Sequence, residues 1–109
     1  MTQRLVANPS PAAAGPLTFH RSLPGYRPSP LVEAPAAAGA LGVERVLVKD
    51  ESDRFGLPSF KVLGASYAIH RAVGDRRDVS LVCATDGNHG RAVAWMARRL
   101  GVPATVFVP

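Results

Sequence analysis

The stretch that decides the fold is LVCATDGNHGRAVAWMARRLGVPATVFVP, residues 81–109. Its first four residues, 81–84, form a short apolar run that predicts a buried strand. Over residues 89–100 apolar side chains recur on one face at helical spacing, and a glycine and a proline follow to end the helix. The run TVFV at 105–108 predicts another strand. A strand, a helix and a strand with connections this short are typical of a parallel βαβ unit.

The residues upstream repeat this order of elements. Residues 46–48 predict a buried strand, and residues 60–73 predict a helix with an apolar stripe every three to four positions. A weaker helix is expected at 35–41. We therefore predict an α/β fold in which a parallel sheet is flanked by helices with right-handed crossovers. Two loops, 50–60 and 85–90, should then open on the same side of the sheet, where such folds place their sites.

The first thirty residues are rich in proline and small side chains. Residues 1–16 can bury little apolar surface, so a flexible leader is expected there. Prolines at positions 24, 28 and 30 predict an irregular segment over 17–30, without a helix or a central strand. The folded part of the chain is therefore expected to span residues 17–109.

Composition limits the kind of protein this is. The chain has 109 residues, of which 47% are hydrophobic, and contains no apolar run near the roughly 20 residues that span a bilayer. The first 15 residues lack the apolar core of a secretory signal, and we expect a cytoplasmic protein without a membrane partner. The single cysteine, Cys83, excludes an intramolecular disulfide and a cysteine-based zinc site.

The net charge is +5 and comes from 11 arginines and 2 lysines against 8 acidic residues. The arginines are scattered, aromatic residues do not interleave with them, and no nucleic-acid-binding motif is present. A solvated basic surface is therefore favoured over a nucleic-acid partner.

Lys61 follows the first loop and lies at the start of the predicted helix. This lysine lies in the sequence SFKVLGA, residues 59–65. An apolar setting at a helix N-terminus disfavours an ammonium ion, which suits an amine that forms a Schiff base. The alternative is a solvated surface lysine, the usual state of this residue type.

The second loop reads TDGNHG, residues 85–90. Its glycines permit close approach by a ligand, and its amides open a helix whose N-terminus can bind an anion. Asn88 offers both a donor and an acceptor, and Asp86 can serve as a base. The alternative is an ordinary strand-to-helix turn capped by Asp86 or Asn88. The spacing is not the G-x-G-x-x-G of dinucleotide sites.

These motifs occur in an order that resembles a known enzyme family. SFK at 59–61, followed by a Gly-Ala pair, and GNH at 87–89 after a strand are similar to the fold type II (tryptophan-synthase-β-like) enzymes, which use pyridoxal 5′-phosphate. SPL at 29–31 and KDE at 49–51 resemble the family's early S/T-P-L and K-x-E segments. Each motif alone is modest, whereas their order and combination are specific.

The resemblance runs from residue 19 to residue 109 and includes a close resemblance to the diaminopropionate ammonia-lyases. It rests on FHRSLPGY, KDESDRFGLP and TDGNHGR, which begin at residues 19, 49 and 85. Threonine dehydratases and serine racemases usually read F-K-x-R-G-A and S-x-G-N-H-A. This sequence instead has Leu63 at the arginine position, Thr85-Asp86 in place of S-x, and Gly90 at the last position.

The resemblance implies a reaction and roles for four residues. Lys61 would bind pyridoxal 5′-phosphate covalently and, once released, act as a base on one face of the substrate Cα. Asp86 would act on the other face or as an acid for the leaving amine. Asn88 would hydrogen-bond the cofactor's ring hydroxyl, and Phe60 would belong to the cofactor-binding residues. The implied activity is α,β-elimination of 2,3-diaminopropionate, a small amino acid, to pyruvate and ammonia, by an enzyme that is a homodimer in the family.

Two alternatives stay open, a threonine or serine dehydratase-like enzyme and a non-catalytic α/β module that binds phosphate. The module would explain both loops but not the placement of Lys61. Family chains are several-fold longer, and their Gly-rich phosphate loop and pyridine-nitrogen partner come later in the chain. We therefore expect the N-terminal portion of a catalytic domain, incomplete at its C-terminus, that alone binds cofactor poorly and is inactive.

Overall fold

The structure, a computed structural model, describes residues 14–109. The three predicted helices and three predicted strands are confirmed, each with bounds within one residue of the prediction. The leader predicted at 1–16 lies almost wholly outside the described residues, and its last three positions begin a helix. The elements are α1 (Ala14–Ser22), β1 (Leu31–Glu33), α2 (Pro35–Leu41), β2 (Leu47–Lys49), α3 (Lys61–Val73), β3 (Leu81–Ala84), α4 (Asn88–Leu100) and β4 (Ala104–Phe107).

Helix α1 corrects the sequence prediction for the N-terminal region. The irregular segment predicted over 17–30 is wrong for residues 17–22, which are helical. The prolines at 24, 28 and 30 all follow the last helical residue, and Pro16 lies in the first turn, where its missing amide costs no helical hydrogen bond. The helix packs on α3, where the Phe19 ring stacks on His70 with centroids 4.4 Å apart.

The described strands form two separate two-stranded sheets. β3 and β4 pair in parallel, with Leu81 opposite Ala104, as the βαβ prediction requires. β2 pairs antiparallel with β1, with Leu31 opposite Lys49. The prediction that β2 joins the parallel sheet is therefore wrong. The connection between β1 and β2, residues 34–46, contains α2 and returns the chain to run antiparallel beside β1.

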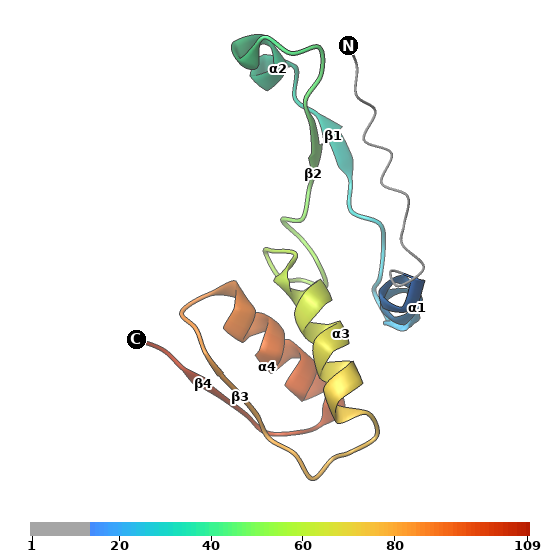
Figure 1. Ribbon diagram of the computed structural model, residues 1–109, viewed down its shortest axis with the longest axis vertical. Helices are drawn as coiled ribbons and strands as arrows, with labels where there is room; N and C mark the ends of the chain where they lie inside the picture. The colour runs from blue at the N-terminus through green and yellow to red at the C-terminus, as the bar shows by residue number, and fades with distance from the viewer. Residues whose placement is uncertain (1–13) are drawn as a thin grey trace.

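Helices α3 and α4 make the core of the larger unit. α4 packs on β3 and β4, and α3 packs on α4 (Figure 1). Most positions of the apolar stripes predicted for both helices are buried, and Ile69 and Leu100 are half-buried. Small side chains at the contact let the two helices approach closely. The cluster between them contains Val62, Ala65 and Ala92, with Phe55, Leu57 and Trp95 packed against it.

A smaller unit stands apart from this core. In Figure 1, α2, β1 and β2 project away from α3, α4, β3 and β4. Its strands expose apolar side chains, among them Leu31 and Leu47. The two units are joined through residues 23–30 and 50–60, so the second connection, which leads to Lys61, also links them. No helix within residues 14–109 is long and apolar enough to cross a membrane.

Gly90 is required for the packing of α4 on the sheet. A Cβ there would lie 2.7 Å from Thr85 Cγ2 and 2.9 Å from Val106 Cγ1. Gly90→Ala is therefore expected to lower the free energy of unfolding by about 1–3 kcal/mol. Gly64→Ala in α3 is the matched control: it meets no atom within 4 Å, and should raise the free energy of unfolding by about 0.5–1 kcal/mol. Urea unfolding measures both, and shifts of the same sign would contradict the packing role.

Candidate active site

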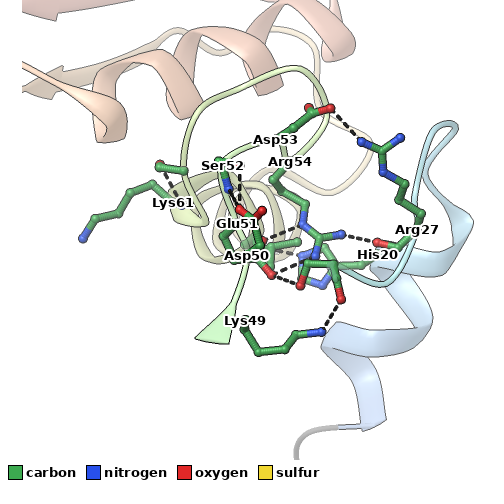
Figure 2. Close-up of polar contacts among 12 residues, drawn as sticks. His20, Arg27, Lys49, Asp50, Glu51, Ser52, Asp53, Arg54 and Lys61 are labelled. Carbon is green, nitrogen blue, oxygen red and sulfur yellow. Dashed lines mark hydrogen bonds and ion pairs between the residues drawn. The ribbon is translucent and has the colours of Figure 1, made fainter. Parts of the chain in front are cut away.

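A buried ion pair anchors the loop that runs from β2 to Lys61 (Figure 2). The Arg54 side chain is only 6% exposed and binds Glu51 through Nε to Oε2 at 2.8 Å and Nη2 to Oε1 at 2.9 Å. Arg54 Nη1 donates to the Arg27 carbonyl oxygen, and the Ser29 hydroxyl donates to Glu51 Oε1. Bidentate pairing of this kind fixes geometry as well as charge. The loop is therefore tied to the segment that precedes β1.

Two further contacts surround this pair. Lys49 Nζ donates to the Ser29 carbonyl oxygen at 2.6 Å. Arg27 Nη2 binds Asp53 Oδ2 at 2.6 Å, but both of these side chains are more than half exposed. Because exposed ion pairs contribute little, the buried pair carries most of the anchoring.

The Glu51 carboxyl is strongly acidic in this setting. The hydrogen bonds from Arg54 are the largest cause, and the Ser29 hydroxyl and the charges of Arg54 and Lys49 act in the same direction against partial burial. Together they lower the pKa of Glu51 from its ordinary value of 4.5 to about 2. The hydrogen bonds to Glu51 in turn raise the pKa of Arg54. Glu51 is therefore an ionised anchor at neutral pH and not a proton donor.

A tight turn follows the ion pair on the way to Lys61. Arg54 and Leu57 exchange two backbone hydrogen bonds, of 2.9 and 3.0 Å. Between them Phe55 and Gly56 both have positive φ, 55° and 78°. Such a turn normally selects glycine or asparagine at both central positions, so the phenylalanine is unusual.

Lys61 begins α3, as predicted, and its amide donates to Ser59 Oγ at 3.2 Å. Its side chain is exposed, with Nζ 5.3 Å from the centroid of the exposed Phe60 ring. Figure 2 shows it directed away from the cluster around Glu51. The apolar setting predicted for this amine is therefore absent from the described residues.

The second loop places its polar residues at the start of α4. Asp86 and Asn88 are both exposed, and the helix is preceded by Gly87, which has no side chain to cap it. The Gly87 amide donates to Thr85 Oγ1 at 3.3 Å. Thr85, and not Asp86 or Asn88, thus supports the turn. Gly90 serves helix packing, whereas the space beside Gly87 is open for a ligand.

The structure brings the two loops to one end of the core. The predicted site residues of the two loops do not line a common cavity. In Figure 1 the first turns of α3 and α4 both lie at the end of the unit to which the carboxyl end of β3 points. Asp86 lines two shallow hollows between β3, α4 and β4. Lys61, Phe60 and Asn88 line neither of them.

Sequence reasoning missed the residues that hold the first loop. Glu51 was part of a recognised motif, but nothing in the sequence distinguished Arg54 from ten other arginines. Its burial depends on Ser29 and Arg27, which are more than 20 residues away. The DRFGLP sequence is a turn signal, yet a positive φ is expected at Gly56 and not at Phe55.

Comparison with known proteins gives the family. The sequence profile described as pyridoxal-phosphate dependent enzyme matches residues 22–109, most of the chain. This chain belongs to that family. The match confirms the predicted fold type II relationship and agrees with pyridoxal 5′-phosphate as the cofactor.

Individual members of the pyridoxal-phosphate dependent family extend this result. The diaminopropionate ammonia-lyase of Escherichia coli K12 is 40% identical over 84% of this chain and 27% of its own length. The crystal structure of the Escherichia coli enzyme in complex with an aminoacrylate-PLP azomethine reaction intermediate has a TM-score of 0.80 at 41% identity, covering 88% of this chain and 28% of that one. A biosynthetic L-threonine dehydratase of Lactococcus lactis is 43% identical over 47% of this chain and 12% of its own length. The chain spans little more than a quarter of the ammonia-lyase.

The described residues fit part of a pyridoxal 5′-phosphate site. The chain has two lysines. Lys49 Nζ is held by a carbonyl oxygen, whereas Lys61 Nζ contacts only the face of Phe60 among the described residues. An exposed amine without a hydrogen-bond partner has the chemistry needed to condense with an aldehyde. The exposed amide of Asn88 can hydrogen-bond a hydroxyl group on the same ligand.

Proposed function

We propose that this protein is a pyridoxal-phosphate-dependent carbon–nitrogen lyase, a diaminopropionate ammonia-lyase, that converts 2,3-diaminopropionate to pyruvate and ammonia. The observation that carries the proposal is the extent of similarity. Identity to a diaminopropionate ammonia-lyase is 40% over 84% of the chain. It is 31% over 79% for a catabolic L-threonine dehydratase of Staphylococcus aureus, and 43% over only 47% for the Lactococcus lactis enzyme. The accessible amine of Lys61 is consistent with this activity. Because the chain spans about a quarter of these enzymes, the activity is proposed for the protein made from its complete coding sequence.

Four residues have proposed roles. Lys61 attaches the cofactor and, when released, moves the Cα proton of the substrate. When bound, pyridoxal 5′-phosphate supplies an electron sink for that deprotonation. Asn88 orients the cofactor ring through its hydroxyl, and Phe60 lies beside it. We further propose that the enzyme is a cytoplasmic homodimer.

Asp86 is the proposed second acid or base. It is exposed on the loop after β3 and lines the hollows at the carboxyl end of the parallel strands, where α/β folds bind substrates. Its carboxylate also suits a substrate that carries a second ammonium group, which threonine and serine lack. This feature favours diaminopropionate within the family.

A dehydratase acting on threonine or serine is the second candidate, supported by the Lactococcus lactis relative. The two candidates differ in product stoichiometry. Diaminopropionate loses its β-amino group and then its α-amino group on hydrolysis, giving two ammonia molecules per pyruvate. Serine gives one ammonia per pyruvate, and threonine gives one per 2-oxobutyrate.

The test assays the protein made from its complete coding sequence, with added pyridoxal 5′-phosphate, against diaminopropionate, threonine and serine. We expect kcat/KM to be at least roughly tenfold higher for diaminopropionate, because its second ammonium has a partner in the site. Ammonia and pyruvate should form in a 2:1 ratio. Preference for threonine or serine would establish the dehydratase, and cofactor binding without turnover of any of the three would support the non-catalytic module.

Asp86→Asn is expected to retain covalently bound cofactor but lose elimination with at least one diaminopropionate enantiomer, by about 100-fold or more in kcat. The physical reason is loss of a proton-transfer group without loss of the attachment site. Separate D- and L-substrate assays check it, with Asp75→Asn, an exposed acid beyond α3, as the matched control. Unchanged turnover with both enantiomers would remove the acid–base role.

A further inference from the structure

The turn of residues 54–57 places a phenylalanine at a position where its backbone requires a positive φ, which strains the chain. Phe55 has φ of 55°, the only non-glycine residue with positive φ among residues 14–109. Asparagine and aspartate relieve this conformation with side-chain hydrogen bonds, but phenylalanine has none to offer. Strain of this kind persists only when surrounding contacts over-determine it, and it is frequent at functional sites.

Phe55 is held by contacts with α4 and with the segment that precedes β1. Its ring lies 5.1 Å from the Trp95 ring on α4 and 6.4 Å from the Tyr26 ring before β1. It also packs against the cluster that includes Val62, the neighbour of Lys61. Trp95 belongs to the helix that begins at Asn88, two turns earlier. One ring thus touches the elements that begin with Lys61 and with Asn88.

The residue before Phe55 prevents the turn from shifting. Arg54 is locked to Glu51 and to the Arg27 carbonyl oxygen, and its guanidinium lies 5.6 Å from the Tyr26 ring centroid. The turn is therefore fixed by a buried ion pair on one side and by an aromatic contact with α4 on the other.

We propose that Phe55 is a positioning residue that sets Lys61 relative to Asn88 by holding the 50–60 loop against α4. Through this contact it aligns the cofactor-attaching amine with the loop that orients the cofactor. The inference rests on the proposed function of Lys61 and adds a residue outside the four assigned above. It predicts that loss of the ring weakens cofactor attachment more than it weakens the fold.

The test measures covalent attachment, not turnover. The protein made from its complete coding sequence is titrated with pyridoxal 5′-phosphate and reduced with borohydride, and the pyridoxyl group on Lys61 is quantified by peptide mass spectrometry. Phe55→Leu keeps an apolar side chain but removes the ring. We expect its apparent Kd for the cofactor to rise roughly tenfold, because a small misplacement of a reacting group costs this much or more.

Three variants separate positioning from stability. Phe55→Tyr keeps the ring and should stay within about twofold of the wild type. Val73→Ala removes buried volume at the far end of α3, so its Tm should fall as for Phe55→Leu while Lys61 labelling is unchanged. Trp95→Leu removes the same contact from α4, and combining it with Phe55→Leu should weaken attachment no further, since the two act through one interface.

Each outcome has one meaning. If the wild type is labelled at Lys61 and Phe55→Leu is labelled with equal affinity, the positioning role is wrong and the proposed function stands. If Val73→Ala loses labelling to the same extent, the effect is one of stability and the positioning role is again wrong. If the wild type takes no label at Lys61, the proposed function fails and this inference fails with it. Should Phe55→Leu not fold, Trp95→Leu decides the same question.

Discussion

Lys61→Ala is expected to carry no pyridoxyl group after incubation with pyridoxal 5′-phosphate and borohydride reduction, and to lose at least about 1,000-fold in kcat. The chain has one other lysine, Lys49, whose ammonium is bound to the Ser29 carbonyl oxygen at 2.6 Å. Lys49 is also exposed, but its ammonium is engaged by this hydrogen bond, so removing Lys61 removes the lysine amine that has no hydrogen-bond partner among the described residues. The size of the loss follows from the removal of both covalent attachment and proton transfer, each worth several orders of magnitude.

Lys49→Ala is the matched control for this result. It removes a lysine of the same chain that takes no part in attachment, so labelling of Lys61 should persist. Peptide mass spectrometry of the reduced protein distinguishes the two lysines. A labelled Lys49 in the Lys61→Ala protein, at wild-type yield, would overturn the assignment of Lys61.

Arg54→Met is expected to lower the free energy of unfolding by about 3 kcal/mol at neutral pH. The Arg54 side chain is 6% exposed and donates two charge-assisted hydrogen bonds to Glu51. The side chain of Glu51 is itself 19% exposed. Methionine fills much of the same space but leaves the carboxylate partly buried and without its partner, and breaking such a pair is costly. Urea unfolding checks this, with Arg27→Met as the control. That variant breaks the exposed pair with Asp53 and should cost less than about 1 kcal/mol.

The same ion pair gives stability a defined pH dependence. The pKa of Glu51 is about 2 in the fold, against an ordinary value of 4.5. A carboxyl with a lowered pKa contributes its full stability above its unfolded pKa and loses it as the pH falls toward the folded value. Between pH 4.5 and about 2 the wild type should therefore lose about 3 kcal/mol through this group, and Arg54→Met should lose much less. Equal acid sensitivity of the two proteins would contradict the role of the pair.

Local sequence was sufficient for most of the secondary structure. The apolar stripes of α3 and α4 and the runs of β3 and β4 carry their own periodicity, and glycine ends α4 in a left-handed conformation as expected. The motif residues Lys61 and Asn88 fall at helix starts for the same reason. These features depend on residues within one or two turns of each other, which is the range that a sequence pattern describes.

The pairing of the strands and the formation of α1 depended on residues that are distant in the sequence. β2 joins β1, not β3, because pairing is decided by which segments meet in space. α1 forms in a proline-rich region because its aromatic residues pack on α3, with Phe19 and His20 close to Tyr67. Propensity could not show this, since the stabilising contacts are more than 40 residues away along the chain.

By itself the sequence determined every described element except α1 and β1, the family motifs and the two residues, Lys61 and Asn88, that begin α3 and α4. Only the tertiary structure decided that Arg54 is buried on Glu51, that Gly90 serves packing, and that Phe55 holds the first loop against α4. The physical reason is the range of the forces involved. Helix and strand patterns arise from near neighbours, whereas the cost of burying a charge or straining a backbone is offset only by groups that folding brings together.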